Sequence, residues 1–478
     1  MAIAYAIDPS VVRVPVVADF GFPADVFILP DGDRHLVFAP LTLGVASVNG
    51  AAARQLQRVR NGDAPLSSLP PSFIAELADA GILVDKDYAN QPVVFPQKDG
   101  YDPNGLTLFL TTRCSLACTY CYASGGDRPS MMSWETAKAG IDWIIRHSEK
   151  QNRKHLSIMF HGGGEVTVAW TLLKQCLLYL HETTAARGMT FDTSAGLNGV
   201  MTGALLEWVI ENINGATVSL DGLPDVHNAQ RPLVTGKGSF DIIAAALRRM
   251  DEAKFNYGLR VTVTRFGLEK MVESVEFMCQ NFGARLIQLE PVFPSGRAQA
   301  NDLQSPDPHE FIRKFRLARE VAAAHGRELK YSGARFGMVT NKFCGVSDDL
   351  LALTPEGFLS SCYEVGESKD PRASTFFYGK LNPDTRDLDV DKRKLRQLRT
   401  LTVENKSSCD DCFCKYSCGG ECSAKLAHSG NAWDATESPR CIINRELTLD
   451  QMREYLNSGG RPPVLTTCEG FLAGAGVS

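Results

Sequence analysis

The stretch that decides the fold is Leu106-Thr-Leu-Phe-Leu-Thr-Thr-Arg-Cys114-Ser-Leu-Ala-Cys118-Thr-Tyr-Cys121. Its apolar beginning predicts a short buried strand, and three thiols follow directly in one loop. A structural zinc site takes four ligands, whereas a [4Fe–4S] cluster held by three cysteines keeps one iron available for a small molecule. The loop therefore indicates an iron–sulfur cluster, and a zinc loop that borrows a distant fourth cysteine is the alternative.

From this stretch onward, short apolar runs alternate with amphipathic helical patterns. The predicted strand and helix pairs are Leu106–Leu110 with 133–149, Leu156–Phe160 with 167–187, Thr190–Ala195 with 203–213, Thr217–Leu220 with 239–254, Leu259–Val263 with 269–281, and Leu286–Glu290 with 308–325. This alternation predicts an α/β fold with a parallel sheet, curved into a partial (β/α)6 TIM-like barrel. Active sites of such folds lie at the carboxyl ends of the strands, where each motif below falls.

Four regions are expected along the 478 residues. Residues 1–98 form a small N-terminal α+β domain, with strands at Asp25–Leu29 and His35–Phe38 and helices at 50–61 and 71–81. The barrel occupies 99–335, a cysteine-rich domain occupies 336–450, and 451–478 is a C-terminal tail. Within the third region, 386–399 is predicted as one mixed-charge helix. We interpret its charges as a solvated face, with a binding patch as the alternative.

Composition excludes several classes of protein. Hydrophobic residues make up 44% and charged residues 22%, as in globular proteins, so neither disorder nor a polytopic membrane protein fits. The net charge of −5 without a basic stripe argues against a nucleic-acid surface. The amino terminus lacks a signal-peptide pattern, so a cytoplasmic location is expected. In that reducing compartment the 14 cysteines are expected to bind metal and not to form disulfides.

The C-x3-C-x2-C loop, with Tyr120 before its last cysteine, resembles the signature of the radical SAM superfamily. The resemblance continues after the second strand, where His161-Gly-Gly-Gly-Glu165 is similar to the family's Gly-Gly-Glu-Pro element, with Val166 in place of proline. Glycines let a backbone approach a ligand closely, and their carbonyls together with a carboxylate can hold an ammonium group. By this resemblance, Gly163, Gly164 and Glu165 contact S-adenosylmethionine (SAM).

Two further strand ends resemble SAM-binding elements of the family. Leu197-Asn198-Gly199 follows the third strand, and Ser219-Leu-Asp221-Gly222 follows the fourth, with His227 and Arg231 shortly after. The resemblance implies that Ser219 and Arg231 hold the methionyl carboxylate, because arginine offers a fork-shaped cation. Tyr120 and Asn198 complete the predicted cofactor-binding set. Asn198 and Asp221 are alternatively turn residues, since Asn-Gly and Asp-Gly are common turn dipeptides.

The remaining cysteine pattern resembles the seven-cysteine SPASM domain. It consists of Cys344, then Gly357 ahead of Cys362, then Cys409-x2-Cys412-x5-Cys418-x3-Cys422, then Cys441. The resemblance implies two auxiliary [4Fe–4S] clusters, one held by Cys409, Cys412, Cys418 and Cys441 and one, nearer the barrel, by Cys344, Cys362 and Cys422. The second set has three ligands for four irons, so the fourth ligand is Cys414 or Cys468, or one iron stays open. A zinc ribbon is the alternative, and Cys176 and Cys279 are expected to be buried core thiols.

By the same resemblance, a reduced cluster passes one electron to SAM, and the resulting 5′-deoxyadenosyl radical abstracts a hydrogen atom. Three [4Fe–4S] clusters, SAM and an external flavodoxin- or ferredoxin-type electron donor are implied. The expected substrate is a ribosomally made precursor peptide, which receives a crosslink, thioether or cyclophane or undergoes excision. The N-terminal domain is expected to bind its leader by strand addition.

Two alternatives remain open. One is sulfatase maturation, whose enzymes characteristically have an aspartate directly after the Cys of the G-x4-C element. This chain has Tyr363 and then Glu364 after Cys362, and we take these two as the candidate catalytic residues. The alternative from another class is a non-catalytic iron–sulfur protein that carries electrons or binds a partner. Release of 5′-deoxyadenosine would distinguish the enzyme from such a protein.

Overall fold

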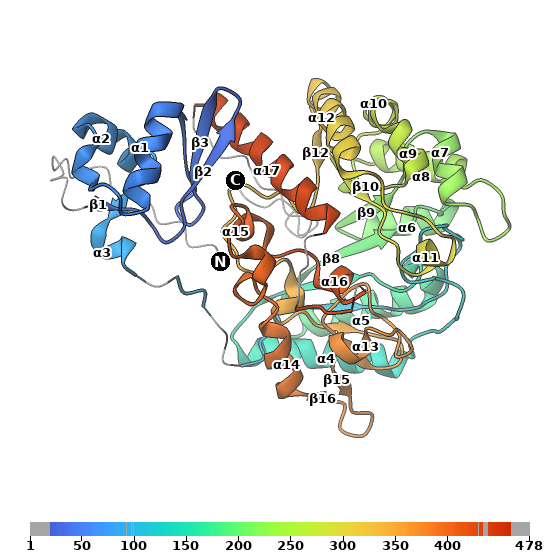
Figure 1. The fold of residues 1–478 in the computed structure, drawn as a ribbon. Coiled ribbons are helices and arrows are strands. Elements are labelled where there is room, and N and C mark those ends of the chain that lie inside the picture. The colour runs from blue at the N-terminus through green and yellow to red at the C-terminus, as the bar shows by residue number, and fades with distance from the viewer. Residues whose placement is uncertain are drawn as a thin grey trace.

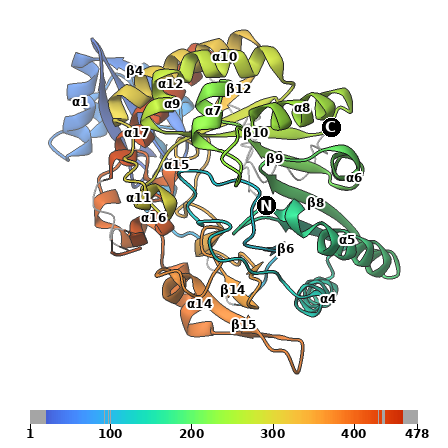
Figure 2. The same cartoon turned by 90° about the vertical axis from the view of Figure 1, so that its right-hand side faces the viewer.

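The computed structural model describes residues 20–459, with the exception of 92, 97, 99, 429 and 434–437. Its centre is one mixed sheet of eleven strands, in the order β12-β11-β10-β9-β8-β7-β6-β13-β14-β15-β16 (Figures 1 and 2). From β12 to β13 all neighbouring strands are parallel, and β14 to β16 continue the sheet in antiparallel pairs. The six predicted strands of the α/β alternation are all present.

The strands of this sheet are β6 (Gly105–Leu108), β7 (His155–Phe160), β8 (Thr190–Leu197), β9 (Gly215–Ser219), β10 (Tyr257–Val263), β11 (Leu286–Pro291), β12 (Glu328–Lys330), β13 (Ala352–Leu353), β14 (Phe358–Ser360), β15 (Phe377–Leu381) and β16 (Leu388–Val390). The strands β12 to β16 were not predicted. β12 and β13 are only two or three residues long, and β13 lies beside β6 although 243 residues stand between Leu108 and Ala352. Because β13 pairs with β6, the expected boundary between barrel and cysteine-rich domain does not divide the sheet.

Helices between the parallel strands cover one face of the sheet (Figure 2). They are α4 (Trp134–Lys150), α5 (Trp170–Ala185), α6 (Gly203–Asn212), α7 (Pro224–Gln230), α8 (Phe240–Glu252), α9 (Arg265–Glu269), α10 (Met271–Asn281) and α12 (Pro308–Ala324). The short helix α11 (Arg297–Ala300) instead lies against the three-cysteine loop, where the Arg297 side chain donates to the carbonyl of Cys118 (3.1 Å). Ser133 caps α4 by accepting a hydrogen bond from the backbone N–H of Thr136 (3.0 Å), as polar N-cap residues commonly do. Alternate strand residues such as Leu259 and Val261 are buried in the core with these helices.

The other residues of each strand face the opposite side, because side chains alternate across a strand. The pairing register aligns Thr107 with Met159 and Ser194, and aligns Ser219 with Arg260 and Gln288. We call this side of the sheet the polar face. It is turned towards the cysteine-rich part of the chain.

The cysteine-rich part contains short helices and one long one. They are α13 (Ala373–Phe376), α14 (Lys392–Arg399), α15 (Lys415–Cys418), α16 (Ser423–His428) and α17 (Pro439–Asn457). The 3₁₀ helices of the described chain are η2 (Leu66–Ser68), η3 (Val166–Ala169), η4 (Gly345–Ser347), η5 (Val403–Asn405) and η6 (Ser407–Cys409). The expected tail boundary at 450/451 falls inside α17, where Asp450 is buried and ion-paired with Arg316 on α12 (2.7 Å). The positions after 459, including Cys468, lie outside the described residues.

The prediction of a single helix at 386–399 was wrong in its first half. Residues Leu388–Val390 form β16 and pair with β15, and the helix begins only at Lys392. Asp391 separates the two elements, because its side chain accepts hydrogen bonds from the backbone N–H groups of Arg393 and Lys394. A mixed-charge pattern does not reveal this strand, since β16 is an edge strand whose pairing partner is set by the sheet.

The N-terminal part has its own small sheet and core. Strands β2 (Phe27–Asp31), β3 (Arg34–Ala39) and β4 (Gly44–Asn49) form an antiparallel sheet with helices α1 (Gly50–Arg60) and α2 (Pro71–Asp79) beside it, close to the predicted elements. A two-stranded ladder of β1 (Phe20–Gly21) and β5 (Val84–Asp85), followed by α3 (Lys86–Ala89), completes the part. A second apolar cluster joins Leu36 and Phe38 of this sheet to Phe413 and Cys414. The N-terminal part therefore packs directly on the cysteine-rich region.

Across the ranges that the structure describes, no helix has the length and apolar character needed to span a bilayer.

Candidate functional site

The three-cysteine loop follows directly on β6, so Cys114, Cys118 and Cys121 lie at the carboxyl end of that strand. Backbone N–H groups of Leu116 and Gly125 donate to the sulfurs of Cys114 and Cys121 (both 3.4 Å). Burial raises the pKa of Cys118 to about 12, and it also raises that of Cys114. Thiolates in such a setting need a positive partner, which iron supplies, and N–H···S bonds of this kind tune iron–sulfur clusters.

The donor geometry distinguishes a cluster from a single ion. Within the described ranges, no group of three His, Cys, Asp or Glu side chains is gathered closely enough to hold one metal ion. Nevertheless the charges of Cys114 and Cys121 both contribute to the raised pKa of Cys118, so the three thiols are neighbours. Three neighbouring cysteines in one loop fit a [4Fe–4S] cluster, which keeps one iron available for a small molecule.

The glycine run after β7 packs against the start of this loop. The backbone N–H of Gly164 donates to the carbonyl of Thr111 (3.0 Å), and a side chain at position 164 would collide with the carbonyl oxygen of Arg113. Gly163 has a left-handed backbone, with φ of +64°. Both glycines are thus needed for close packing on the cysteine loop, a role that sequence reasoning did not assign to them.

Glu165 and Asn198 form one hydrogen-bonded unit beside the loop. The Glu165 carboxylate accepts bonds from the backbone N–H of Asn198 (2.6 Å) and from the hydroxyl of Thr167 (2.8 Å). Burial raises the pKa of Glu165, although these bonds oppose the shift. The Asn198 amide donates to the hydroxyl of Ser115 (2.9 Å), and its oxygen accepts the N–H of Val200 (2.9 Å). Asn198 therefore shapes its own turn and also contacts the loop.

A second unit joins Tyr120, Asp221 and Arg231 beneath the loop. The Tyr120 hydroxyl donates to Asp221 (2.7 Å) and accepts a bond from an Nη of Arg231 (2.5 Å). Arg231 is only 8% exposed, and its buried Nε has no hydrogen-bond partner. A buried donor without an acceptor is costly, so this atom fits an incoming carboxylate such as that of SAM.

The other predicted residues of this end have different surroundings. Ser219 is half-buried at the last position of β9. His227 is fully buried, accepts the backbone N–H of Asp221 (3.2 Å) and contacts the Ser239 hydroxyl (3.0 Å). Burial lowers the pKa of His227 to about 3. His227 thus orders the turn after β9, whereas Ser219 lies on the polar face.

The C-terminal cysteines form two groups. The pKa of Cys362 is raised by burial and then by the neighbouring charges of Glu364, Cys422 and Cys344. The pKa of Cys414 is raised by its hydrogen bond with Cys412 and by burial, with contributions from Cys418 and Cys441, and its sulfur lies 3.4 Å from that of Cys412. After burial, the charges of Cys412 and Cys441 contribute to the raised pKa of Cys409. We call Cys344, Cys362 and Cys422 the three-thiol group and Cys409, Cys412, Cys414, Cys418 and Cys441 the five-thiol group.

Cys414 was one of three options for the fourth position of the cluster nearer the sheet, with Cys468 and an open iron as the others. Cys414 lies with the five-thiol group and is buried with Phe38 and Phe336, whereas Cys468 lies outside the described residues. Cys176 and Cys279 are buried in the main core, as predicted.

Tyr363 and Glu364 follow the three-thiol group on the polar face. The Thr107 hydroxyl of β6 donates to the Tyr363 hydroxyl (3.4 Å), and the His161 ring lies edge-on to the Tyr363 ring with centroids 5.3 Å apart. The Glu364 carboxylate is ion-paired with Arg372 (3.1 Å), which Asp370 also holds (2.9 Å). Tyr363 therefore faces the sheet, whereas the Glu364 carboxylate already has a cationic partner.

Sequence reasoning missed several residues of this region. Burial raises the pKa of Tyr122, and the charges of Glu364, Cys121 and Cys362 raise it further, whereas the charge of Arg260 lowers it. Tyr122 therefore lies near these four residues. A charged residue at one position of an otherwise apolar strand, as at Arg260 in β10, was the available signal. Tyr122 gave no such signal, because only the fold brings the residue after Cys121 close to the three-thiol group.

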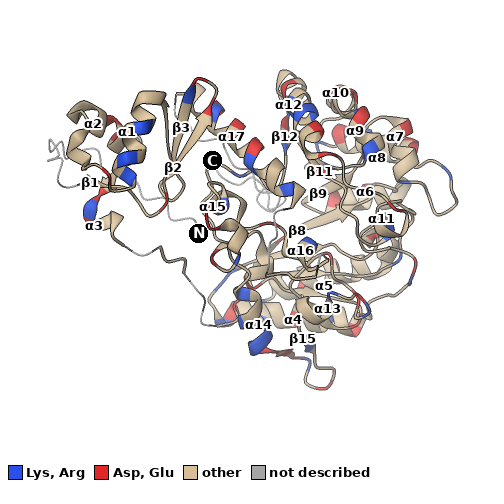
Figure 3. Cartoon of the chain, viewed as in Figure 1, with Lys and Arg blue, Asp and Glu red and all other residues tan. Residues whose placement is uncertain are grey.

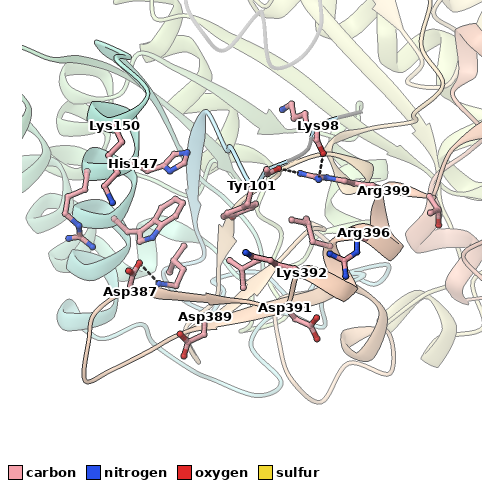
Figure 4. A pocket seen from close by; sticks show the side chains of 17 residues that line it. Lys98, Tyr101, His147, Lys150, Asp387, Asp389, Asp391, Lys392, Arg396 and Arg399 are labelled. Carbon is pink, nitrogen blue, oxygen red and sulfur yellow. Dashed lines mark hydrogen bonds between the residues drawn. The ribbon is translucent and has the colours of Figure 1, made fainter. Parts of the chain in front are cut away.

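A large cavity lies elsewhere, at the amino end of β6. It has a volume of about 1130 Å³ and lies between α4, the segment before β6 and α14 (Figure 4). Lys98, Lys150, Lys392 and Arg396 line it, and α14 carries several of the basic residues marked in Figure 3. None of the predicted site residues lines this cavity. The candidate site is therefore at the opposite ends of the strands.

Comparison with known proteins identifies one domain of the chain. Residues 108–278 match the model of the radical SAM superfamily. The chain is 27% identical over 359 residues to mycofactocin maturase MftC of Mycolicibacterium smegmatis, which covers 71% of this chain and 83% of that protein.

Two solved structures share the fold. Native anSMEcpe with bound AdoMet has a TM-score of 0.59 at 16% identity and covers 74% of this chain and 100% of its own. Streptococcus suis SuiB bound to precursor peptide SuiA has a TM-score of 0.50 at 14% identity and covers 88% of this chain and 99% of its own. Together with the cysteine loop that follows β6, the family match shows that residues 108–278 form a radical SAM domain.

Proposed function

We propose that this enzyme modifies a ribosomally made precursor peptide. The observation that carries the proposal is the match to mycofactocin maturase MftC, which extends over 71% of the chain and so continues well beyond the radical SAM segment. The fold shared with SuiB, solved with its precursor peptide, supports the same substrate class. The polar face between the cysteine loop and the three-thiol group is the place for the reacting residue.

The chain's own residues would bind and orient the reactants. Cys114, Cys118 and Cys121 would hold a [4Fe–4S] cluster, and Arg231 and Ser219 would hold the methionyl carboxylate of SAM, with Glu165 and the carbonyls of Gly163 and Gly164 on its ammonium group. When bound, cluster and SAM supply a 5′-deoxyadenosyl radical that abstracts a hydrogen atom. Tyr120 would hold the loop in position through its hydrogen bonds with Asp221 and Arg231, and Asn198 through its bond to Ser115.

The cysteine-rich part would be a SPASM domain with two further clusters, on a sheet that forms a partial barrel. Cys409, Cys412, Cys418 and Cys441 would hold one cluster within the five-thiol group. The three-thiol group would hold the other, and its fourth position would be taken by Cys468 or left open to a substrate. Tyr363, the residue after Cys362, would lie beside this cluster. The electron required by SAM would come from an external flavodoxin- or ferredoxin-type protein in the reducing cytoplasm, and no disulfide joins any of the 13 described cysteines.

The N-terminal sheet would bind the leader of the peptide. In the described chain β2 pairs only with β3, so its other edge has backbone groups available for an added strand. Removing 1–98 is a poor test, because it would uncover Phe413 and Cys414. Amide hydrogen exchange of the full chain with added precursor should slow at 27–31, and unchanged exchange there would contradict leader binding by this sheet.

Sulfatase maturation remains the second candidate within the family. It would need a proton acceptor after Cys362, where this chain has Tyr363, and the following Glu364 is paired with Arg372. The structure of this segment therefore favours the peptide proposal.

The deciding experiment uses the anaerobically reconstituted enzyme, SAM, a chemical reductant and the short peptide encoded beside its gene. We expect 5′-deoxyadenosine release and a peptide mass change, most simply a loss of two hydrogens. A sulfatase-derived peptide serves as the control substrate. Its conversion in place of the neighbouring peptide would overturn the proposal.

A further inference from the structure

Arg260 is an exposed cation in the middle of a buried parallel strand. Its neighbours Leu259 and Val261 are 1% and 4% exposed and pack under the helices, whereas the Arg260 side chain is on the polar face and exposed. A central strand of a helix-covered sheet is normally apolar, so a charged residue at this position calls for an explanation.

The register gives Arg260 polar neighbours and one nearby carboxylate, that of Glu290, whose pKa is lowered, against the effect of burial, by Arg440, Lys425 and then Arg260. Its flanking residues on the same face are Ser219 of β9 and Gln288 of β11. The nearest acidic residue along β11 is Glu290, whose carboxylate accepts bonds from Gln288 (2.8 Å) and the backbone N–H of Ser332 (2.9 Å) and is paired with Arg440 (3.3 Å). Among the described residues, no hydrogen bond or ion pair engages the Arg260 guanidinium.

Charge effects show where the guanidinium lies. Burial, and next the charge of Arg260, lower the pKa of His161 to about 4. It also opposes the burial that raises the pKa of Tyr122. His161 follows β7 and Tyr122 follows the cysteine loop, so Arg260 extends over the polar face towards the space between the cysteine loop and the three-thiol group.

Two arginines thus serve different parts of the site. Arg231 lies under the loop, where it opposes the burial that raises the pKa of Cys118 and hydrogen-bonds Tyr120. Arg260 lies on the other side of the space, near His161 and Tyr122. A substrate that fills this space excludes water, and a desolvated guanidinium without an anion is costly. The ligand should therefore bring the missing anion.

We propose that Arg260 is the cation of a carboxylate subsite on the polar face, and that the carboxylate belongs to the peptide substrate. Arginine presents a planar fork that matches a carboxylate in a bidentate manner, which fixes the peptide relative to the cysteine loop. The group is the C-terminal carboxylate or an aspartate or glutamate side chain of the segment to be modified. This inference rests on the proposed peptide function and adds a requirement on the sequence of the substrate.

The test measures affinities of the reconstituted holoenzyme for two probes, SAM and the fluorescein-labelled precursor peptide. Arg260→Gln should weaken peptide binding tenfold or more and leave SAM affinity within twofold of the wild type. Arg260→Lys should recover part of the peptide affinity, since it keeps the charge but loses the fork. Arg248→Gln, which removes an exposed arginine from α8, is the matched control and should change neither affinity.

A set of peptide analogues identifies the carboxylate. Each has one acidic side chain, or the C-terminus, converted to an amide. One analogue should bind the wild type as weakly as the unmodified peptide binds Arg260→Gln, and the variant should show no further loss with it. If Arg260→Gln weakens SAM binding and spares the peptide, the carboxylate is that of SAM and the peptide assignment is overturned.

Unchanged affinities for both probes would overturn the subsite altogether. Failure of the proposed function would look different, because wild-type enzyme would then cleave SAM but neither bind nor modify the peptide.

Discussion

The two C-terminal cysteine groups differ in what surrounds them. The five-thiol group is closed in by apolar packing, with Phe413 and Cys414 against Phe38 of the N-terminal sheet and Met452 of α17. The Asn444 amide of α17 donates to the sulfur of Cys418 (3.1 Å). The three-thiol group is instead flanked by Tyr363 and Glu364 and neighbours Tyr122 of the cysteine loop.

This difference suggests distinct tasks. Apolar enclosure shields a cluster from solvent and ties three parts of the chain together, whereas a cluster on the polar face is within reach of a substrate. We therefore expect changes at the five-thiol group to reduce stability and changes at the three-thiol group to affect the reaction. The following experiments test this contrast, and the largest expected effect comes first.

Replacing Cys114, Cys118 and Cys121 together with alanine should abolish SAM cleavage, because no cluster would remain to receive SAM. Iron content should fall by about four atoms from about 12, the total expected for three four-iron clusters. Iron analysis and 5′-deoxyadenosine release are the measurements. SAM cleavage by this variant would show that another cysteine group performs the role and would remove the basis of the contrast.

Cys362→Ala should reduce peptide modification more than 100-fold, roughly 2.7 kcal/mol or more in transition-state terms, while SAM cleavage without peptide continues. The reason is that the three-thiol group faces the substrate but does not hold SAM. Product mass and 5′-deoxyadenosine are measured in parallel. Cys176→Ala, at a buried thiol of α5 outside both groups, is the control and should modify peptide normally. Normal turnover by Cys362→Ala would reduce the three-thiol group to a structural role.

Arg231→Ala should weaken SAM binding by about 1.5–3 kcal/mol, since it removes a charge-assisted contact to the carboxylate. The iron content and the spectroscopic signal of the three-thiol group should be retained, which separates the SAM side from the substrate side. Calorimetric titration with SAM gives the affinity. Equal SAM affinity in variant and wild type would make Arg231 a support of Tyr120 only.

Cys414→Ala should have the smallest effect, a loss of about 1 kcal/mol in the free energy of unfolding from a small cavity in the apolar cluster. Iron content and peptide modification should be unchanged if Cys409, Cys412, Cys418 and Cys441 suffice as ligands. EPR spectra of the reduced protein check the second point. A changed signal of the three-thiol group would contradict the placement of Cys414.

Local patterns predicted most of the fold and part of the site. The six strands of the α/β alternation and the helices between them were found because each carries an apolar period of its own. The strands β12 to β16 were missed, since runs of two to five residues carry little or no period and their pairing depends on distant strands. The cysteine loop was found because its three ligands are adjacent in sequence, whereas Tyr122 and Arg260 acquire meaning only from what lies across the polar face.

The sequence alone therefore determined the strand–helix alternation, the cysteine loop after the first strand of the large sheet, and the glycine run beside it, because these signals are local. Only the tertiary structure decided which cysteines gather with which, that Cys414 lies with Cys412, and that no ion pair among the described residues holds Arg260. The physical reason is that ligand grouping and charge pairing depend on distances between segments far apart in the chain. Those distances are set by sheet order and packing, and spacing along the sequence does not report them.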